Sequence, residues 1–356
     1  MDEDLSSFKT IAGKLRYSND IYRKGENGND AGLDRVRNGF LQEGLLISTA
    51  VTPELARNLK SVCQRLGILE INVDAFVYAS KDIQAECFGS GSTKTLIRFS
   101  SALIELLDAD EFEFVVGHEL GHFLLKHGLV HTEVDNSSAE HAIQKRAQEI
   151  SADRIGLVAC QSLEVAIKAL MKTASGLSNT HLRFDVSSFV SQLRDSPETI
   201  SLESQISTHP SILIRCRALL WFSMSDMFTR GVEYYSKEKV LKLDKRIIND
   251  MNKFVDAPFN RRIKEAETNL ELWTAAYSSI QGGTFNKEDQ KRISELFGES
   301  ILGKLKTFLS NTQAEETEQI VFERLKEARD SLEQLIPSRF EVSVKNIQQR
   351  IDSKLT

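Results

Sequence analysis

Residues 116–123 read Val-Gly-His-Glu-Leu-Gly-His-Phe and contain the pattern His-Glu-x-x-His. The run 112–116 before it is mostly apolar, as in a buried helix. On a helix, residues four apart lie on one face, so His118 and His122 can present two imidazoles to one metal ion. Glu119 lies next to that face and can reach a metal-bound water as a general base. The stretch therefore predicts a metal-binding helix at the centre of the fold.

A pair of carboxylates follows on a second predicted helix, 139–160. Glu149 and Asp153 are again four residues apart. A catalytic zinc takes three protein ligands and keeps a fourth position open. One of these carboxylates can bind the metal while the other orients a ligand histidine. Ala152, between them, leaves room for the two helices to approach.

A third motif is Ser-Thr-His209-Pro210, which opens a predicted helix over 211–228 that carries Arg215. A histidine at a helix N-terminus beside the metal could donate a hydrogen bond to a developing oxyanion. The alternative is that His209 only caps the helix that begins at Pro210.

In this order, the three motifs resemble the HtpX and CAAX-prenyl-protease family of zinc metallopeptidases, over about residues 50–228. The resemblance implies a gluzincin-like fold that binds one Zn²⁺ per chain. It gives roles to seven residues: His118, His122 and Glu149 as zinc ligands, Glu119 as the base, Asp153 as the group behind a ligand, and His209 and Arg215 as helpers at the substrate site. The segment 84–88 departs from the Asn-Ala-Phe of many relatives, and 175–208 is particular to this chain, so the substrate preference does not transfer.

The remaining patterns predict an α+β fold that is mostly helical, with a small β-sheet. Thr52 and Pro53 open a helix, and two β-rich runs, 71–79 and 95–99, predict neighbouring strands. In such peptidases a substrate can pair with an exposed strand edge, and Thr95, Leu96 and Ile97 are the candidate edge. An ordinary sheet strand without a substrate role is the alternative, and it stays open.

Three regions are expected along the chain: a helical lead-in over 1–48, a metallopeptidase core over 49–229, and an all-helical accessory domain over 230–356. The change near 230 is a shift to Glu, Lys and Arg with helical spacing. The last region faintly resembles TerB-like helical modules, although a generic helical bundle explains the pattern as well. It is the candidate docking region for a regulatory partner.

The composition excludes several classes of protein. The 356 residues carry a net charge of -6 and show no basic cluster with interleaved aromatics, so a nucleic-acid partner is not expected. The start lacks a signal-peptide pattern, and no apolar run reaches the roughly 20 residues of a membrane span. The four cysteines are far apart, which indicates free thiols. We therefore expect a soluble, cytoplasmic protein.

The other histidines, His127, His131 and His141, are predicted to have surface or capping roles. Cys87 is a minor alternative as an inhibitory zinc thiolate. The leading functional prediction is a zinc metalloendopeptidase that cleaves protein or peptide substrates through a zinc-bound water activated by Glu119. Two alternatives stay open: a non-catalytic, zinc-stabilised interaction module that acts through the C-terminal helices, and a hydrolase of non-peptide amides.

Overall fold

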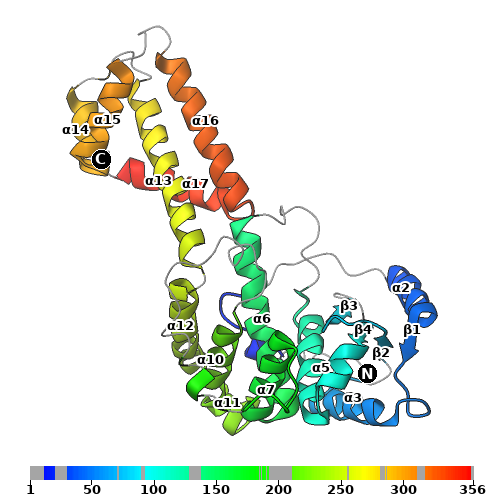
Figure 1. Cartoon of the computed structure of the whole chain (residues 1–356). Helices are drawn as coiled ribbons and strands as arrows, with labels where there is room; N and C mark the ends of the chain where they lie inside the picture. Colours follow the sequence, from blue (N-terminus) through cyan, green and yellow to red (C-terminus); the bar gives the residue numbers. More distant parts are fainter. Residues whose placement is uncertain are drawn as a thin grey trace. The chain divides into compact units, whose positions relative to one another are not determined.

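The structure is a computed structural model. It describes residues 12–20, 30–69, 72–89, 93–127, 138–183, 185, 187–189, 191, 211–254, 256–280, 285, 287–310 and 317–353. The contacts divide the chain into two compact units (Figure 1). The first unit groups Met1–Glu133 with Ile143–Val255, and the second groups Val134–Ala142 with Asp256–Thr356.

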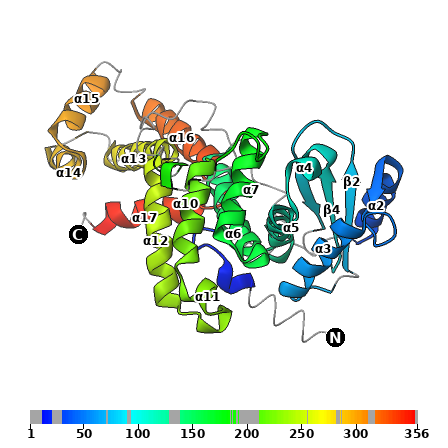
Figure 2. The same cartoon turned by 60° about the horizontal axis from the view of Figure 1, so that its bottom comes forward.

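The first unit contains one four-stranded sheet, in the order β1 (Gly44–Leu46), β2 (Val73–Tyr78), β4 (Thr95–Ser100) and β3 (Ala85–Phe88). Strands β2 and β4 are parallel, and each outer strand pairs antiparallel with its neighbour. Figure 2 shows the sheet between α2 and α5. Phe76 and Leu96 pack toward α2, whereas Ile97 and Phe99 join the main core. The predicted α+β, mostly helical class is confirmed.

The prediction that Thr95, Leu96 and Ile97 form an exposed strand edge is wrong. β4 lies inside the sheet and pairs with β2 on one side and β3 on the other. The three side chains are 0%, 3% and 0% exposed. The edge strand on this side is β3, which sequence analysis did not identify as a strand. Its four residues are all half-buried, so the alternation that marks a strand is missing.

The helices of the first unit follow the predicted ones closely, including the helix expected over 139–160. They are α2 (Asp30–Glu43), α3 (Pro53–Arg65), α4 (Ser101–Leu106), α5 (Ala109–Leu124), α6 (Ala139–Cys160, whose first turn groups with the second unit), α7 (Leu163–Ser175), α10 (Ile212–Ser223), α11 (Asp226–Thr229), the 3-10 helix η3 (Val232–Tyr234) and α12 (Lys237–Phe254). The helix expected over 211–228 is divided, because Ser225 caps a new helix by accepting a hydrogen bond from the Phe228 amide.

Helix α5 is the central element of this unit. Its N-terminus is closed by a capping box, in which Asp108 and Glu111 each accept a hydrogen bond from the other's backbone amide at 2.9 Å. Nearly every residue of the helix is buried, since α3, α7 and β3 pack around it. A helix that is buried on all sides holds its side chains rigidly, as a binding site requires.

Helices α5 and α6 approach each other through small residues. A Cβ atom added at Gly117 would lie 2.3 Å from the Cβ of Ala159, and one at Gly121 would lie 3.1 Å from the Cα of Ala152. A Cβ atom added at Gly156 of α6 would likewise lie 2.9 Å from Phe114 of α5. The room predicted from Ala152 is therefore part of a longer contact that brings the two helix backbones close together.

Residues 12–20 also belong to this unit. Tyr17 is 1% exposed, and its backbone amide donates to Ser151 Oγ of α6 at 3.0 Å. The Ser18 amide donates to Asp244 Oδ2 of α12 at 2.9 Å, and Asp244 in turn pairs with Arg154. This short segment is thus tied to two helices that follow it by more than a hundred residues.

The second unit is helical throughout its described residues. It contains α13 (Ala257–Ile280), α14 (Lys287–Phe297), α15 (Glu299–Ser310), α16 (Thr317–Leu335) and α17 (Phe340–Ser353), with α13 and α16 side by side (Figure 1). The contacts group α12 with the first unit, where it packs on α10, so the units divide at residue 255. The domain boundary near residue 230 and the TerB-like resemblance stay predictions. None of the described helices is long and apolar enough to span a membrane.

The close approach of α5 and α6 gives a first prediction. Gly117→Ala should lower the free energy of unfolding by about 1–3 kcal/mol, because the new methyl group meets Ala159 in a packed core. The double variant Gly117→Ala, Ala159→Gly should recover part of this loss. Gly39→Ala is the control, since a Cβ there meets nothing within 4 Å, and the change should be neutral or stabilise α2 by up to about 1 kcal/mol. Urea unfolding measures all three, and equal effects at the two glycines would contradict the packing argument.

Candidate metal centre

The two histidines of α5 converge on one point. The Nε2 atoms of His118 and His122 lie 3.1 Å apart, which follows from their spacing of four residues on a helix. Both residues belong to the buried helix whose N-terminus Asp108 caps, so their backbone positions are fixed. Glu119 lies between them in the sequence and is 8% exposed.

Helix α6 brings a carboxylate to the same point. Glu149 Oε2 lies 3.5 Å from His118 Nε2, and Glu149 Oε1 lies 3.4 Å from His122 Nε2. Among the described residues, these three side chains form a group whose ligand atoms all lie within 4.8 Å of one another. Two helices that are far apart in the sequence therefore supply one convergent set of donors.

This donor set fits a zinc ion. Bonds of about 2.0–2.2 Å in a tetrahedral arrangement place neighbouring ligand atoms about 3.3 Å apart. The 3.1 Å between the two Nε2 atoms is close to that value, and so are the 3.5 and 3.4 Å that separate His118 Nε2 from Glu149 Oε2 and His122 Nε2 from Glu149 Oε1. Two imidazoles and one carboxylate are also the ligands that catalytic zinc sites use, with a fourth position left open.

Asp153 holds the first ligand histidine from behind. Its Oδ1 lies 3.0 Å from His118 Nδ1, so an ionised Asp153 accepts a hydrogen bond from the N–H at that nitrogen, and the Nε2 lone pair stays free. Arg215 of α10 fixes the carboxylate in turn, donating from Nη2 at 2.6 Å and from Nε at 2.8 Å. The Arg215 guanidinium also lies 3.4 Å from Glu149. The structure thus places Arg215 against two carboxylates of α6, Glu149 and Asp153.

The electrostatics of the centre favour two ionised carboxylates on α6. Burial alone would raise the pKa of Glu149, but the contact with His122 and the charge of Arg215 hold it well below its ordinary value. Burial would also lower the pKa of His118, yet the contacts with Asp153 and Glu149 raise it. The pKa of Glu119 is raised, chiefly by burial, which is the direction expected of a group that exchanges protons near neutral pH.

A cavity of about 650 Å³ opens on the donor set. Residues 83–88, which include strand β3, form one wall, and His118, Glu119 and Glu149 line it from the helices. Lys145, one turn before Glu149, also lines the cavity, and burial lowers its pKa. The sheet edge therefore borders the space in which the candidate base and the donors meet.

Several predicted residues lie elsewhere. Thr95, Leu96 and Ile97 do not line this cavity, because they belong to an internal strand and their side chains are buried against the faces of the sheet. His209 lies outside the described residues, and so does His131. Cys87 lines the cavity, but burial raises the pKa of its thiol to about 12, which opposes thiolate formation. All four cysteines are free, as predicted.

Sequence analysis missed one histidine of this centre. The prediction of a surface or capping role for His127 is wrong, because the residue is 3% exposed and its Nδ1 lies 2.8 Å from Nδ1 of His122. Its Nε2 lies 2.9 Å from Asp20 Oδ2, and burial lowers its pKa to about 4. The spacing of five residues from His122 was visible in the sequence, but its partner Asp20 lies 107 residues away.

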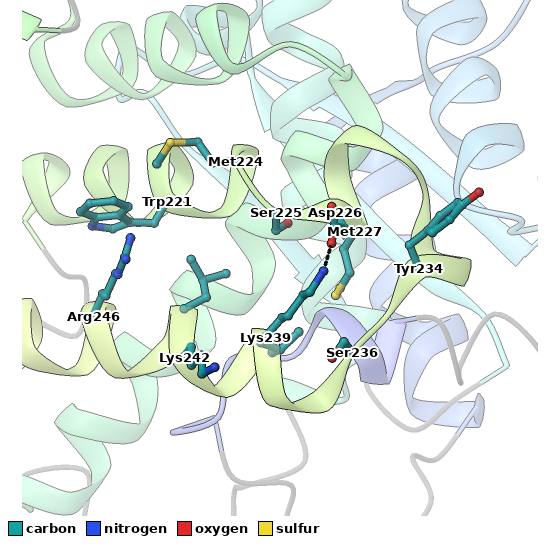
Figure 3. A pocket seen from close by; sticks show the side chains of 12 residues that line it. Trp221, Met224, Ser225, Asp226, Met227, Tyr234, Ser236, Lys239, Lys242 and Arg246 are labelled. Atoms are coloured by element: carbon teal, nitrogen blue, oxygen red, sulfur yellow. Dashed lines mark hydrogen bonds and ion pairs between the residues drawn. The ribbon is translucent and has the colours of Figure 1, made fainter.

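A second cavity, of about 370 Å³, lies between α10 and α12 and has no lining residue in common with the first. Figure 3 shows Arg246 against the ring of Trp221, with 4.7 Å between the guanidinium carbon and the ring centroid. Lys239 pairs with Asp226 across the cavity. None of the groups described above for the metal centre reaches it.

Comparison with known proteins agrees with this geometry. Residues 49–143 match the model of Peptidase family M48, a segment that includes the sheet strands β2 to β4 and helix α5. A curated relative, the "Plastoglobule-localized metallopeptidase 48, chloroplastic" of Arabidopsis thaliana, is 27% identical over 191 residues. The match covers 46% of this chain and 54% of the relative, so the chain spans about half of that protein's length. No solved structure gives a significant match. These findings support an M48-type metallopeptidase and confirm the resemblance predicted from the motifs.

The contact between Asp153 and His118 gives a second prediction. Asp153→Asn should weaken zinc binding by about 10- to 100-fold, because the residue orients a ligand and sets its tautomer. The control is Asp250→Asn. Asp250 pairs with Arg217, which lies on α10 like Arg215, but this ion pair is away from the donors. Competition with a chromophoric chelator measures the dissociation constants. Equal affinities in both variants would show that Asp153 does not support the metal.

Proposed function

We propose that this chain is a zinc-dependent endopeptidase with His118, His122 and Glu149 as the ligands and Glu119 as the general base. The observation that supports it best is the convergence of three side chains, each with one ligand atom within 4.8 Å of the others, beside a cavity walled by a sheet edge. The M48 match over 49–143 agrees with this proposal.

Glu119 is placed for proton transfer. It follows the first ligand histidine, lines the cavity and is buried. Its carboxylate would accept a proton from the attacking water and return it to the amine of the leaving product. A zinc ion at this donor set supplies Lewis acidity, which polarises the scissile carbonyl and acidifies water. Burial strengthens these charge effects, because water competes less inside the cavity.

A polypeptide substrate fits the edge position of β3. Strand β3 pairs with β4 on one side only, and residues 83–88 line the cavity. An extended peptide can add to such an edge through main-chain hydrogen bonds, which hold it with little dependence on side chains. A peptide held along the strand would be cut at an internal bond, which is why we propose an endopeptidase.

Three further predictions belong to this proposal. His209, which precedes α10, is proposed to stabilise the oxyanion. The second unit is proposed to dock a regulatory partner. A cytoplasmic location stays a prediction as well, and the name of the Arabidopsis relative places that protein in plastoglobules. The alternative of a non-catalytic zinc module is less favoured, because two of the three donors, His118 and Glu149, line one cavity together with the buried carboxylate of the proposed base.

The proposal is tested with two glutamate variants. Glu119→Gln should keep zinc and lower peptide hydrolysis by at least about 10²-fold, since it removes only the base. Glu149→Gln should weaken zinc binding, and its activity should recover in part at high zinc. Hydrolysis of casein and of a mixed peptide library is measured, with zinc content determined on the same samples. Full activity of Glu119→Gln would exclude this mechanism, and a zinc-free wild-type protein would exclude the metal centre itself.

A further inference from the structure

A chain of hydrogen bonds runs from the second ligand histidine to the N-terminal segment 12–20. Nδ1 of His122 lies 2.8 Å from Nδ1 of His127, and Nε2 of His127 lies 2.9 Å from Asp20 Oδ2. His127 is 3% exposed and Asp20 is 2% exposed, so water does not interrupt the chain. Asp20 also accepts a hydrogen bond from Gln144 at 3.1 Å and pairs with Arg16 at 3.1 Å.

The positions of the protons follow from these contacts. Two ring nitrogens 2.8 Å apart form a hydrogen bond with one proton between them. The carboxylate of Asp20 is an acceptor, so His127 carries its proton on Nε2. A neutral His127 then accepts at Nδ1, and His122 donates from its own Nδ1. The lone pair of His122 is left on Nε2, the atom that faces His118 and Glu149.

The two ligand histidines are therefore oriented by different groups. His118 donates directly to the carboxylate of Asp153, at 3.0 Å. His122 donates to the neutral imidazole of His127, and His127 in turn donates to the carboxylate of Asp20. Both arrangements leave Nε2 free, but only the second one depends on residues that precede the sheet.

We propose that Asp20 and His127 are positioning residues for the metal, which fix His122 in the tautomer that presents Nε2, and that docking of residues 12–20 is a step in forming the metal centre. This inference rests on the proposed zinc site. The segment has further contacts that would hold it there: Arg16 Nη2 donates to the Leu125 carbonyl at 2.7 Å, and Tyr17 is buried beside α6. Metal binding and the docking of this segment should then favour each other.

Zinc affinity of the full-length chain tests the inference. His127→Phe removes the acceptor for the His122 proton, and Asp20→Leu removes the acceptor for the His127 proton. Each should weaken zinc binding by about 10- to 100-fold, as the loss of a group behind a metal ligand does. His127→Gln should recover part of the affinity, because its side-chain oxygen can accept from His122.

Asp244→Asn is the matched control. Asp244 accepts from the Ser18 amide and so holds the same segment, but it does not contact either histidine. If the segment acts only through fold stability, this variant and His127→Phe should change the melting temperature of the zinc-free protein alike and leave the zinc dissociation constant unchanged. The proposal requires that His127→Phe and Asp20→Leu raise the zinc dissociation constant, and that Asp244→Asn change it much less.

The outcomes separate the two proposals. A wild-type chain that binds no zinc would overturn the proposed function. A wild-type chain that binds zinc tightly, together with His127→Phe and Asp20→Leu variants of equal affinity, would overturn only the positioning role. The Co²⁺-loaded proteins provide a second readout, because a shift in the d–d absorption of His127→Gln relative to wild type reports a change at the ligand His122, whereas Asp244→Asn should retain the wild-type spectrum.

Discussion

The close contact between α5 and α6 is the constraint on which the metal centre depends. Donor atoms on two helices can meet at about 3.3 Å only when the backbones approach closely, and a side chain at the contact would hold them apart. Gly117 and Gly121 of α5 face Ala159 and Ala152 of α6, where an added Cβ would collide or press on its neighbour. The small residues thus allow the two helices, and the motifs that they carry, to come close enough to form one site. The capping box at Asp108 and the burial of α5 keep the first motif in place.

The charges of the centre form a second constraint. Three carboxylates, Glu119, Glu149 and Asp153, are buried within one region, and Arg215 is the guanidinium that pairs with two of them. Buried carboxylates are stable only when cations or hydrogen bonds compensate them. His118 donates a hydrogen bond to Asp153, and a divalent cation between the donors would add the remaining positive charge. The same residues that supply lone pairs to a metal therefore also require its charge.

The sequence predicted the parts of the centre that depend on local periodicity. The spacing of His118 and His122, and of Glu149 and Asp153, identified two helix faces, and the structure brings these faces into contact. Strand order was not predictable in the same way. The runs 71–79 and 95–99 were identified as strands, but nothing in them shows that β3 lies outside β4. The four-residue strand β3 lacks the alternation that would have marked it as the edge.

His127 and Asp20 show a further limit of local patterns. A histidine five residues after His122 has no helical reason to face it, since residues five apart do not share a helix face. The contact arises because α5 ends at Leu124 and Lys126 adopts a positive φ of 58°, which turns the chain back toward the helix. Asp20 then meets His127 through tertiary packing of the segment 12–20 on α6 and α12. Such a contact depends on the packing of segments far apart in the sequence, so no local pattern predicts it.

The described groups of the centre come from four separate stretches of the chain: 12–20, α5 with His127, α6, and α10. The groups themselves all belong to the first unit. Because each stretch contributes a group that fixes another, the centre is complete only when all four have packed. Asp20 orients His127, His127 orients His122, and Arg215 orients Asp153 behind His118. In the proposed centre, metal affinity would be a property of the folded unit, and binding of the ion would be coupled to the stability of contacts far from the ligands.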